Sequence, residues 1–312
     1  MSRTTPRRQI AGTAAFTGLA AWWSRRQRGL APYLFIAPFV ALFLVFFAYP
    51  VANALYLSTF KRHGYGAPRY VGLQNYADLL GDGRFLHSLG NTTYYAAGSL
   101  FVLSPLALLI ALALNSPRLR LVGLYRLLFF LPFVTSAVVV ALMFYLVFDK
   151  TYGLLNNALG VVGIPHIPWL ESTSWSMTSI LLLGIWTYVG VNALFFLAGL
   201  QNVAKELVEA ARIDGANSTS VFRHITVPQL RPIILFVAVQ AVIGSYNLFA
   251  QPFVLTQGGP EDSSMTMTLY LYIEGFQFSQ AGYAAAIGFS IAVIIIVVSL
   301  VQLWLLGAFS DD

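Results

Sequence analysis

The chain has 312 residues, of which 58% are hydrophobic and 10% charged, and its formal net charge is +6. Soluble domains carry about 25% charged residues, so this composition, with a mean hydropathy of +0.72, excludes an ordinary soluble protein and indicates an integral membrane protein. The absence of cysteine excludes disulfides, thiolate chemistry and cysteine-based metal sites.

Residues 1–30 form a basic N-terminal tail. Six of the eighteen Lys and Arg residues lie in the first 28 positions, which favours an orientation signal over a nucleic-acid-binding patch, so we expect no nucleic-acid partner. The apolar run 10–23 is too short to span a bilayer and is followed by "SRRQR", not by a small-residue cleavage site. An interfacial helix or a disordered tail is therefore favoured over a seventh span or a signal peptide.

Six later segments are apolar over about 20 residues, the length that crosses a hydrocarbon core. We predict spans at 31–59, 91–114, 124–148, 177–200, 233–255 and 283–308. Pro105 and Pro132 are expected to bend the second and third spans.

Basic residues in the loops predict the orientation. With the N-terminus inside, the six basic residues of the tail are joined inside by seven more, Arg118, Arg120, Arg126, Lys205, Arg212, Arg223 and Arg231. Five lie outside, namely Lys61, Arg62, Arg69, Arg84 and Lys150. The excess of basic residues inside favours a cytoplasmic location for both termini.

The stretch 209–230, "EAARIDGANSTSVFRHITVPQL", is polar and lies between the fourth and fifth spans. "NVAKELVEAARI" predicts an amphipathic helix that ends at Asp214-Gly215, because glycine tolerates the left-handed C-cap. Asn217 or Ser218 can cap a second short helix, which we expect Pro228 to end. Such a pair of helices either packs against its own bundle or fills a groove on a soluble partner.

This stretch resembles the EAA loop of the permeases of ABC importers. Glu209-Ala210-Ala211, Gly215, Ile225 and Val227-Pro228 carry the likeness. The departure is Val227, where leucine is usual. "PYLFIAPF" at 32–39, "VGLQNYADLL" at 71–80, "YRLLFFLPFVTSAVVVALMFYLVF" at 125–148, "YGLLNNALG" at 152–160, "LAGLQNVAKEL" at 197–207 and "TQGGP" at 256–260 extend it over residues 31–312 and favour the carbohydrate-uptake branch, which includes the maltose, lactose and glycerol-phosphate permeases.

The resemblance implies an all-α transmembrane domain at 31–312 with a cytoplasmic coupling loop at about 203–228. In that family the loop docks on an ATPase subunit. The positions that correspond to the docking element are Glu209, Ala210, Ala211, Asp214, Gly215, Ile225 and Pro228. The implied partners are a second homologous permease, two ATPase subunits that bind ATP and magnesium, an external sugar-binding protein and membrane lipid. The implied location is a bacterial or archaeal cytoplasmic membrane, and the implied solute is a sugar, a di- or oligosaccharide.

The residues support an externally powered transporter. No Lys, Arg, Asp or Glu lies in the centre of a predicted span, whereas many coupled carriers use such charges. There is no Gly-Lys pair, and hence no phosphate-binding loop, and the four histidines lack zinc-binding spacing. We therefore expect no catalytic residue, metal or bound cofactor in this chain. A secondary carrier or channel and a non-transporting membrane scaffold stay open as alternatives.

A neutral sugar needs uncharged hydrogen-bonding groups and aromatic faces along its passage. The fourth and fifth spans offer such groups, several of them at or beside positions that bind sugar in the maltose permease. The candidates are Tyr188, Val191, Asn192, Gly244, Ser245, Tyr246, Asn247, Leu248 and Gln251. We expect Tyr188 with Asn192, and Asn247 with Gln251, to share helical faces. The alternative is that these groups only bond neighbouring helices.

Overall fold

The structure is a computed structural model that describes residues 31–61, 66–117 and 119–305. The predictions for the tail 1–30 and for Arg62 and Arg118 lie outside these residues. The chain divides into two units, Met1–Tyr56 and Leu57–Asp312, and each is described by itself. The first contains most of the helical run Ala31–Ser58, which includes a π-helical turn η1 (Leu44–Ala48) and α2 (Tyr49–Ser58) and confirms the first predicted span.

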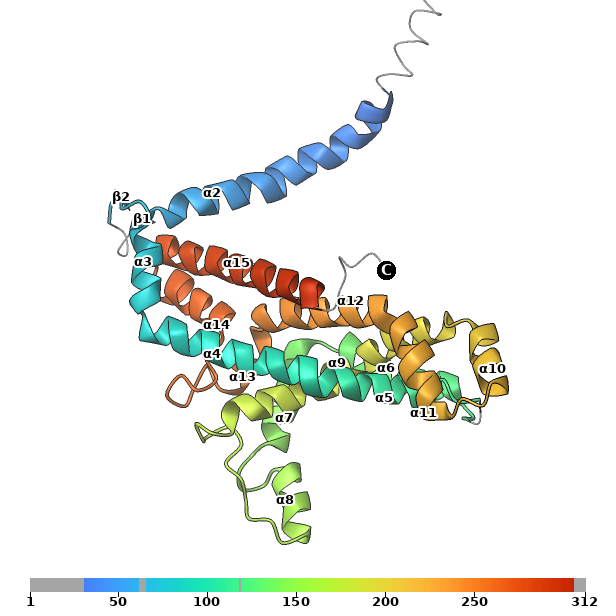
Figure 1. Cartoon of the computed structure of the whole chain (residues 1–312). Coiled ribbons are helices and arrows are strands. Elements are labelled where there is room, and N and C mark those ends of the chain that lie inside the picture. The colour runs from blue at the N-terminus through green and yellow to red at the C-terminus, as the bar shows by residue number, and fades with distance from the viewer. Residues whose placement is uncertain (1–30, 62–65, 118, 306–312) are drawn as a thin grey trace, which may run out of the picture. The chain divides into compact units, whose positions relative to one another are not determined.

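The second unit is a bundle of long apolar helices (Figure 1). Among the described residues of the whole chain, five helices are long and apolar enough to cross a membrane, or six if one bent pair counts as a single span. Four of the five lie in this unit. Three of these four are continuous runs, built from α4 (Gly83–Gly98), η2 (Ser99–Leu103) and α5 (Ser104–Leu114), from α9 (Ser176–Gln201), and from α15 (Ala281–Leu305).

Helix α9 lies at the centre of this bundle. Its side chains Ile180, Leu183 and Ala193 are fully buried, and it packs against α4, α5, α6 and α12. A helix that is apolar on all sides is expected to be surrounded by others. The predicted limits of the fourth span, 177–200, are confirmed to within a residue at each end.

The third predicted span, 124–148, is not one straight helix. It consists of α6 (Val122–Val134) and α7 (Ala137–Val147), which meet at 97°. Pro132 lies inside α6, and the bend is three residues later, where Thr135 and Ser136 are extended (ψ 144° and 128°). The Thr135 hydroxyl donates to the carbonyl of Leu131 at 3.0 Å, a bond that competes with helix continuation.

The fifth span begins earlier than residue 233 and breaks before residue 255. A helical run starts with α11 (Ser218–Val221), passes through η3 (Phe222–Thr226) and continues as α12 (Val227–Tyr246). The prediction that Pro228 ends the second short helix was therefore wrong. Asn247–Phe249 interrupt the run before α13 (Ala250–Leu255), so Asn247 and Gln251 do not share one helical face.

Three prolines explain three of the π-helical turns. η1, η2 and η3 each end two residues before a proline, at Pro50, Pro105 and Pro228. A proline ring clashes with the carbonyl oxygen four residues earlier, and a locally wider turn moves that carbonyl aside. These prolines therefore lie inside helical runs, including the one at Pro228.

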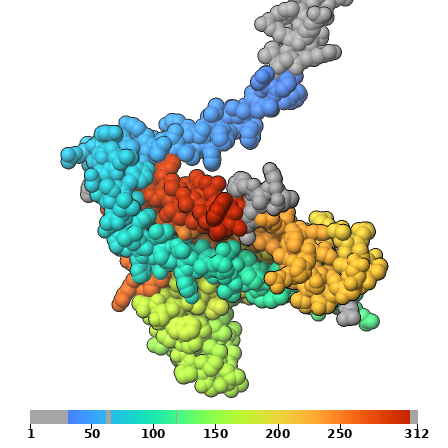
Figure 2. Space-filling model, in the orientation of Figure 1, coloured from blue at the N-terminus to red at the C-terminus, as the bar shows by residue number. Residues whose placement is uncertain are grey.

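The end of the bundle opposite α10 (Lys205–Ile213) carries the shorter elements (Figure 1). They are β1 (Phe60–Lys61) and β2 (Arg69–Tyr70), which pair antiparallel, α3 (Gln74–Gly81), α14 (Met267–Tyr272) and η4 (Ile273–Gln277). Figure 2 shows the segment that contains α8 (Leu154–Val161), coloured yellow-green, projecting from the bundle. The all-α class is confirmed, with this one short hairpin added.

Candidate coupling surface and membrane passage

Helix α10 ends in a glycine cap. Gly215 has φ +87°, and the backbone N–H groups of Gly215 and Ala216 donate to the carbonyls of Arg212 and Ala211 at 3.1 and 2.9 Å. This pair of bonds is the Schellman motif, which satisfies the last carbonyls of a helix and turns the chain sharply. The predicted C-cap at Asp214-Gly215 is confirmed.

The second arm of the coupling loop is anchored at both ends. The Asn217 side chain caps α11 by accepting from the N–H of Ser220 at 2.8 Å, as predicted. Val221 and Leu230 are buried, and the side chain of Gln229 accepts from the N–H of Ala204 at 3.2 Å. The two arms therefore form one compact corner at the end of the bundle (Figure 1).

The corner presents mixed polar and apolar side chains. Of the predicted docking residues, Ala211 and Ile225 are half-buried and the rest are exposed: Glu209, Ala210, Asp214, Gly215 and Pro228. Sequence reasoning missed Ile213, which is 86% exposed, and Leu207 on the same helix is 51% exposed. Glu209 and Ile213 are four residues apart, so an acidic and an apolar side chain lie on one exposed face of α10 and are accessible to a partner.

The break between α12 and α13 is a built feature of the bundle. It frees carbonyl groups that a continuous helix would use, and threonines that flank the start of α14 satisfy them. Thr266 Oγ1 donates to the carbonyl of Leu248 and Thr268 Oγ1 to that of Tyr246, both at 2.7 Å. Discontinuous helices with irregular backbone in mid-bundle commonly form solute sites in transporters.

Tyr188 lies where this break meets the bend of the third span. Its hydroxyl accepts from Gln251 Nε2 on α13 at 3.3 Å, and its ring packs edge-on against Phe133, near the end of α6, with centroids 6.2 Å apart. Gly190 allows α6 and α9 to approach, because a Cβ there would overlap the carbonyl oxygen of Phe129. Residues from α6, α9 and α13 thus converge on one position.

The remaining passage candidates differ in exposure. Val191 and Asn192 are half-buried on α9, and Asn247 is exposed at the break. Gly244 is exposed with open space around it.

Three others lie in the interior of the chain: Ser245, Tyr246 and Leu248. The Ser245 hydroxyl donates to the carbonyl of Ala241 at 2.6 Å, and the Tyr246 hydroxyl bonds Thr93 at 3.0 Å.

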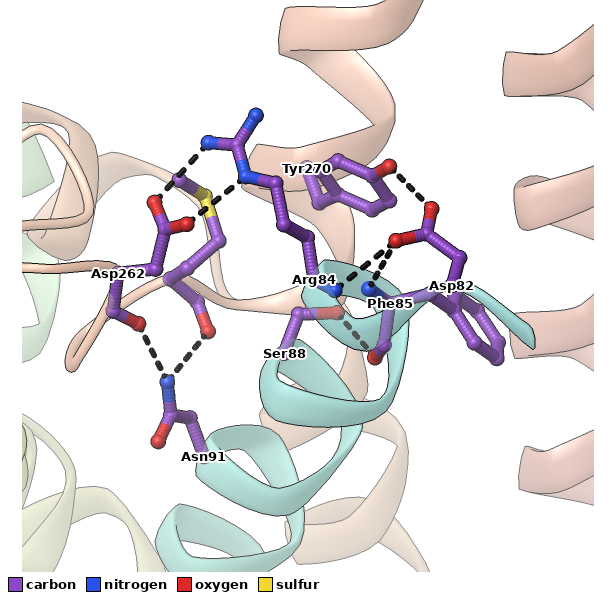
Figure 3. Close-up of polar contacts among 8 residues, drawn as sticks. Asp82, Arg84, Phe85, Ser88, Asn91, Asp262 and Tyr270 are labelled. Atoms are coloured by element: carbon purple, nitrogen blue, oxygen red, sulfur yellow. Dashed lines mark hydrogen bonds and ion pairs between the residues drawn. The ribbon is translucent and has the colours of Figure 1, made fainter. Parts of the chain in front are cut away.

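Sequence reasoning missed a polar cluster at the end opposite α10 (Figure 3). Arg84 makes two hydrogen bonds to the Asp262 carboxylate, at 2.8 and 3.0 Å. Asn91 donates to the backbone carbonyls of Asp262 and Met265 at 2.9 and 3.0 Å. These bonds hold the loop between α13 and α14 on helix α4, across more than 170 residues of sequence.

Asp82 is the second centre of this cluster. It caps α4 by accepting from the N–H groups of Arg84 and Phe85, and its other oxygen accepts from the hydroxyls of Tyr270 and Tyr283 at 2.5 and 2.6 Å. Burial raises the pKa of Asp82, but these hydrogen bonds outweigh it and lower that pKa overall. Only the capping role was visible in the sequence, as an Asp directly before a helix.

The sequence profile of one family matches residues 103–310, and that family is described as the binding-protein-dependent transport system inner membrane component. The chain belongs to this family. It is therefore the permease subunit of a binding-protein-dependent ABC importer.

Named relatives cover almost the whole chain. The arabinooligosaccharides transport system permease protein AraP of Bacillus subtilis (strain 168) is 40% identical over 90% of each chain. The lactose transport system permease protein LacF of Rhizobium radiobacter is 36% identical over 90% of this permease and 95% of the relative.

A solved structure supports the fold. The crystal structure of a bacterial ABC transporter involved in the import of the acidic polysaccharide alginate matches with a TM-score of 0.80, over 93% of this permease and 100% of that chain. Because the two sequences are only 22% identical, this match supports a shared fold and nothing more.

Proposed function

We propose that this permease forms half of the membrane passage for a neutral di- or oligosaccharide. Relatives named for arabinooligosaccharide and lactose transport support a sugar as the solute. The predicted spans carry no charge at their centres, which favours a neutral solute over an ionic one.

The complete transporter contains several other subunits. A second homologous permease supplies the other half of the passage, and two ATPase subunits, which hold ATP and magnesium, supply the energy. An external sugar-binding protein delivers the solute. This chain itself binds no cofactor or metal and catalyses no reaction. The assembly lies in a bacterial or archaeal cytoplasmic membrane, with both termini of this chain in the cytoplasm.

The observation that carries the mechanism is one continuous helical run. It begins at Ser218 in the coupling corner and ends at Tyr246, beside the break. At 1.5 Å per residue it is roughly 40 Å long. Movement of the ATPase subunits against Glu209 and the exposed Ile213 on α10 would therefore pass through the corner at Gly215 to this run and along it to Asn247, as alternating access by rigid elements requires.

In this proposal, the passage is lined where the two helix breaks meet. Tyr188 offers an aromatic face, and Asn247 and Asn192 offer uncharged donors and acceptors. Gln251 is buried and holds the Tyr188 hydroxyl in place by donating to it. Gly244 leaves room for the solute to approach the backbone of α12. The buried Ser245, Tyr246 and Leu248 contribute by holding the break in place.

Transport by the reconstituted complex tests this proposal. Truncation of Asn247 to alanine should raise the half-saturation concentration, or lower the rate, by roughly three- to tenfold, the effect of one lost hydrogen bond. Asn157→Ala is the matched control, since Asn157 is exposed on α8 and its side chain bonds only the carbonyl of Tyr152 among the described residues.

Two results would contradict the proposal. Unchanged transport in both Asn247→Ala and Tyr188→Ala would assign these residues to helix packing and the site to the partner permease. Sugar uptake without any ATPase subunit would favour the alternative of a secondary carrier.

A further inference from the structure

A cavity lies one helical turn beyond Gln251 along α13. Its volume is about 320 Å³, and its walls come from the end of α7, the segment before α9 and the end of α13. Leu255 is four residues from Gln251, a rise of about 6 Å. Small-molecule sites have volumes of about 300–1,000 Å³, so this cavity has room for a small group such as one saccharide unit.

The cavity has rigid walls. Asn156 is fully buried, and its side-chain amide donates to the carbonyls of Lys150 and Ile167, both at 2.9 Å. Its carbonyl oxygen accepts from the indole N–H of Trp169 at 2.9 Å. Trp169 in turn packs on Phe148, which lines the cavity, with ring centroids 5.9 Å apart. A site that is already ordered binds its ligand without a further ordering cost.

The polar groups of the cavity have unused hydrogen-bonding capacity. Asp149 uses Oδ1 to accept from the N–H groups of Thr151 and Tyr152, and its Oδ2 has no partner among the described residues. Lys150 and Glu171 are 3.5 Å apart and more than half exposed. Carboxylates accept from sugar hydroxyls and an ammonium donates to them.

The cavity also has an aromatic side chain that can contact a sugar ring. Tyr145 is 50% exposed at the wall of the cavity, and the C–H face of a pyranose or furanose packs on such a ring. The charged side chains of the lining are two carboxylates and one ammonium, a net charge of −1. This field disfavours an acidic sugar.

We propose that this cavity is an outer saccharide site, which takes one unit of a neutral oligosaccharide before the solute reaches Tyr188 and Asn247. Glu171, Asp149 and Lys150 bind hydroxyls and Tyr145 stacks on the ring. The inference rests on the proposed function, because it takes the solute to be a saccharide, and on the predicted orientation, which places this end outside.

Saturation-transfer NMR tests the site directly. The assembled transporter is placed in nanodiscs without the sugar-binding protein and probed with arabinotriose, lactose, maltotriose and the acidic trigalacturonate. At least one neutral probe should bind and trigalacturonate should not. Tyr145→Ala and Glu171→Gln should each weaken binding roughly three- to tenfold. The control is Tyr152→Ala, an exposed tyrosine outside the cavity.

A charge reversal makes the test specific. Glu171→Lys changes the net charge of the lining from −1 to +1, so trigalacturonate should now bind. Assembled-complex yield and basal ATP hydrolysis, measured for every variant, show that the fold is intact, and the isosteric Glu171→Gln remains informative if Tyr145→Ala assembles poorly.

Failure of the site is distinguishable from failure of the proposed function. If no neutral probe binds, or if the signal is lost in Asn247→Ala but kept in Tyr145→Ala, the outer site is overturned. ATP-driven uptake, measured separately with the sugar-binding protein, would still support the proposed function. If the probes bind as expected but no sugar is taken up, the outer site stands and the proposed function falls.

Discussion

Gly215 shows how one backbone conformation can serve coupling. Its φ of +87° has a counterpart at Gly163, with φ +79°, and a Cβ at either position would meet nothing within 4 Å. The N–H groups of Gly163 and Ile164 donate to the carbonyls of Gly160 and Leu159, the same Schellman motif as at Gly215. The two glycines therefore differ in location and not in local geometry.

This pair gives a matched test of the coupling corner. Valine at either glycine should cost about 1–2 kcal/mol of backbone strain, so Gly215→Val and Gly163→Val should lower thermal stability by similar amounts. Only Gly215→Val should reduce sugar uptake and substrate-stimulated ATP hydrolysis together. Equal losses of both activities in the two variants would show that strain, and not the coupling corner, is responsible.

Asp82 predicts a pH dependence. The pKa of Asp82 is lower in the folded protein than its ordinary value of 3.8. At pH values above 3.8 the carboxylate is therefore charged, and its bonds to Tyr270 and Tyr283 stabilise the fold fully. This contribution is lost as the pH falls through the lower folded value. Asp82→Asn should therefore lower the melting temperature of the purified complex at neutral pH, and the deficit should shrink below about pH 4. A deficit that is constant with pH would assign the effect to capping geometry alone.

The broken fifth span depends on two threonine hydroxyls. Thr268→Val keeps the shape of the side chain but leaves the carbonyl of Tyr246 without this donor, which should cost about 1–3 kcal/mol. Thr268→Ser keeps the hydroxyl and is the control. Melting temperatures of the detergent-purified complex should fall for valine and hardly change for serine. Equal effects would mean that packing, not the hydrogen bond, maintains the break.

Apolar length predicted most of the helices, but not their interruptions. The fourth and sixth spans agree closely with hydropathy, because burial or lipid exposure demands a long apolar run. The bend at Thr135 and the break at Asn247 involve two or three residues each, too few to change an average over 20 positions. Prolines did not predict where helices end or bend. Pro228 lies within a helical run, and the bend near Pro132 is three residues after it, at Thr135.

The candidate site was predictable only in its local parts. The cap at Gly215 and the cap at Asn217 follow from nearest neighbours in the chain. The contacts of Tyr188 with Gln251 and of Arg84 with Asp262 join residues 63 and 178 positions apart. No local pattern encodes such pairs, because they depend on how the helices pack.

Ion pairs refine the charge balance of the whole permease. Three of the five basic residues predicted to lie outside pair with carboxylates on the same side of the chain: Lys61 with Asp78, Arg84 with Asp262 and Lys150 with Glu171. The basic residues of the coupling corner, Lys205, Arg212 and Arg223, make no ion pair among the described residues. Three carboxylates of the same corner, Glu206, Glu209 and Asp214, are likewise without an ion pair in the described part of the chain, so the orientation rests on the count of basic residues and not on net charge.

Reporter fusions check this orientation. A reporter after residue 312 should be cytoplasmic, and one inserted near Gly258 should be external. Detection of both on the same side would contradict the six-span topology.

The bend at Thr135 and Ser136 also bears on how the permease is made. At 1.5 Å per residue, α6 and α7, of 13 and 11 residues, are about 20 and 17 Å long, and the hydrocarbon core is about 30 Å thick. Neither arm can enter a bilayer alone as a stable spanning helix. We therefore expect residues 122–147 to insert as a single apolar unit and to take the right-angled shape afterwards, when α9 packs against α6 and α13 against α7. On this expectation, bending follows insertion in the biogenesis of this permease.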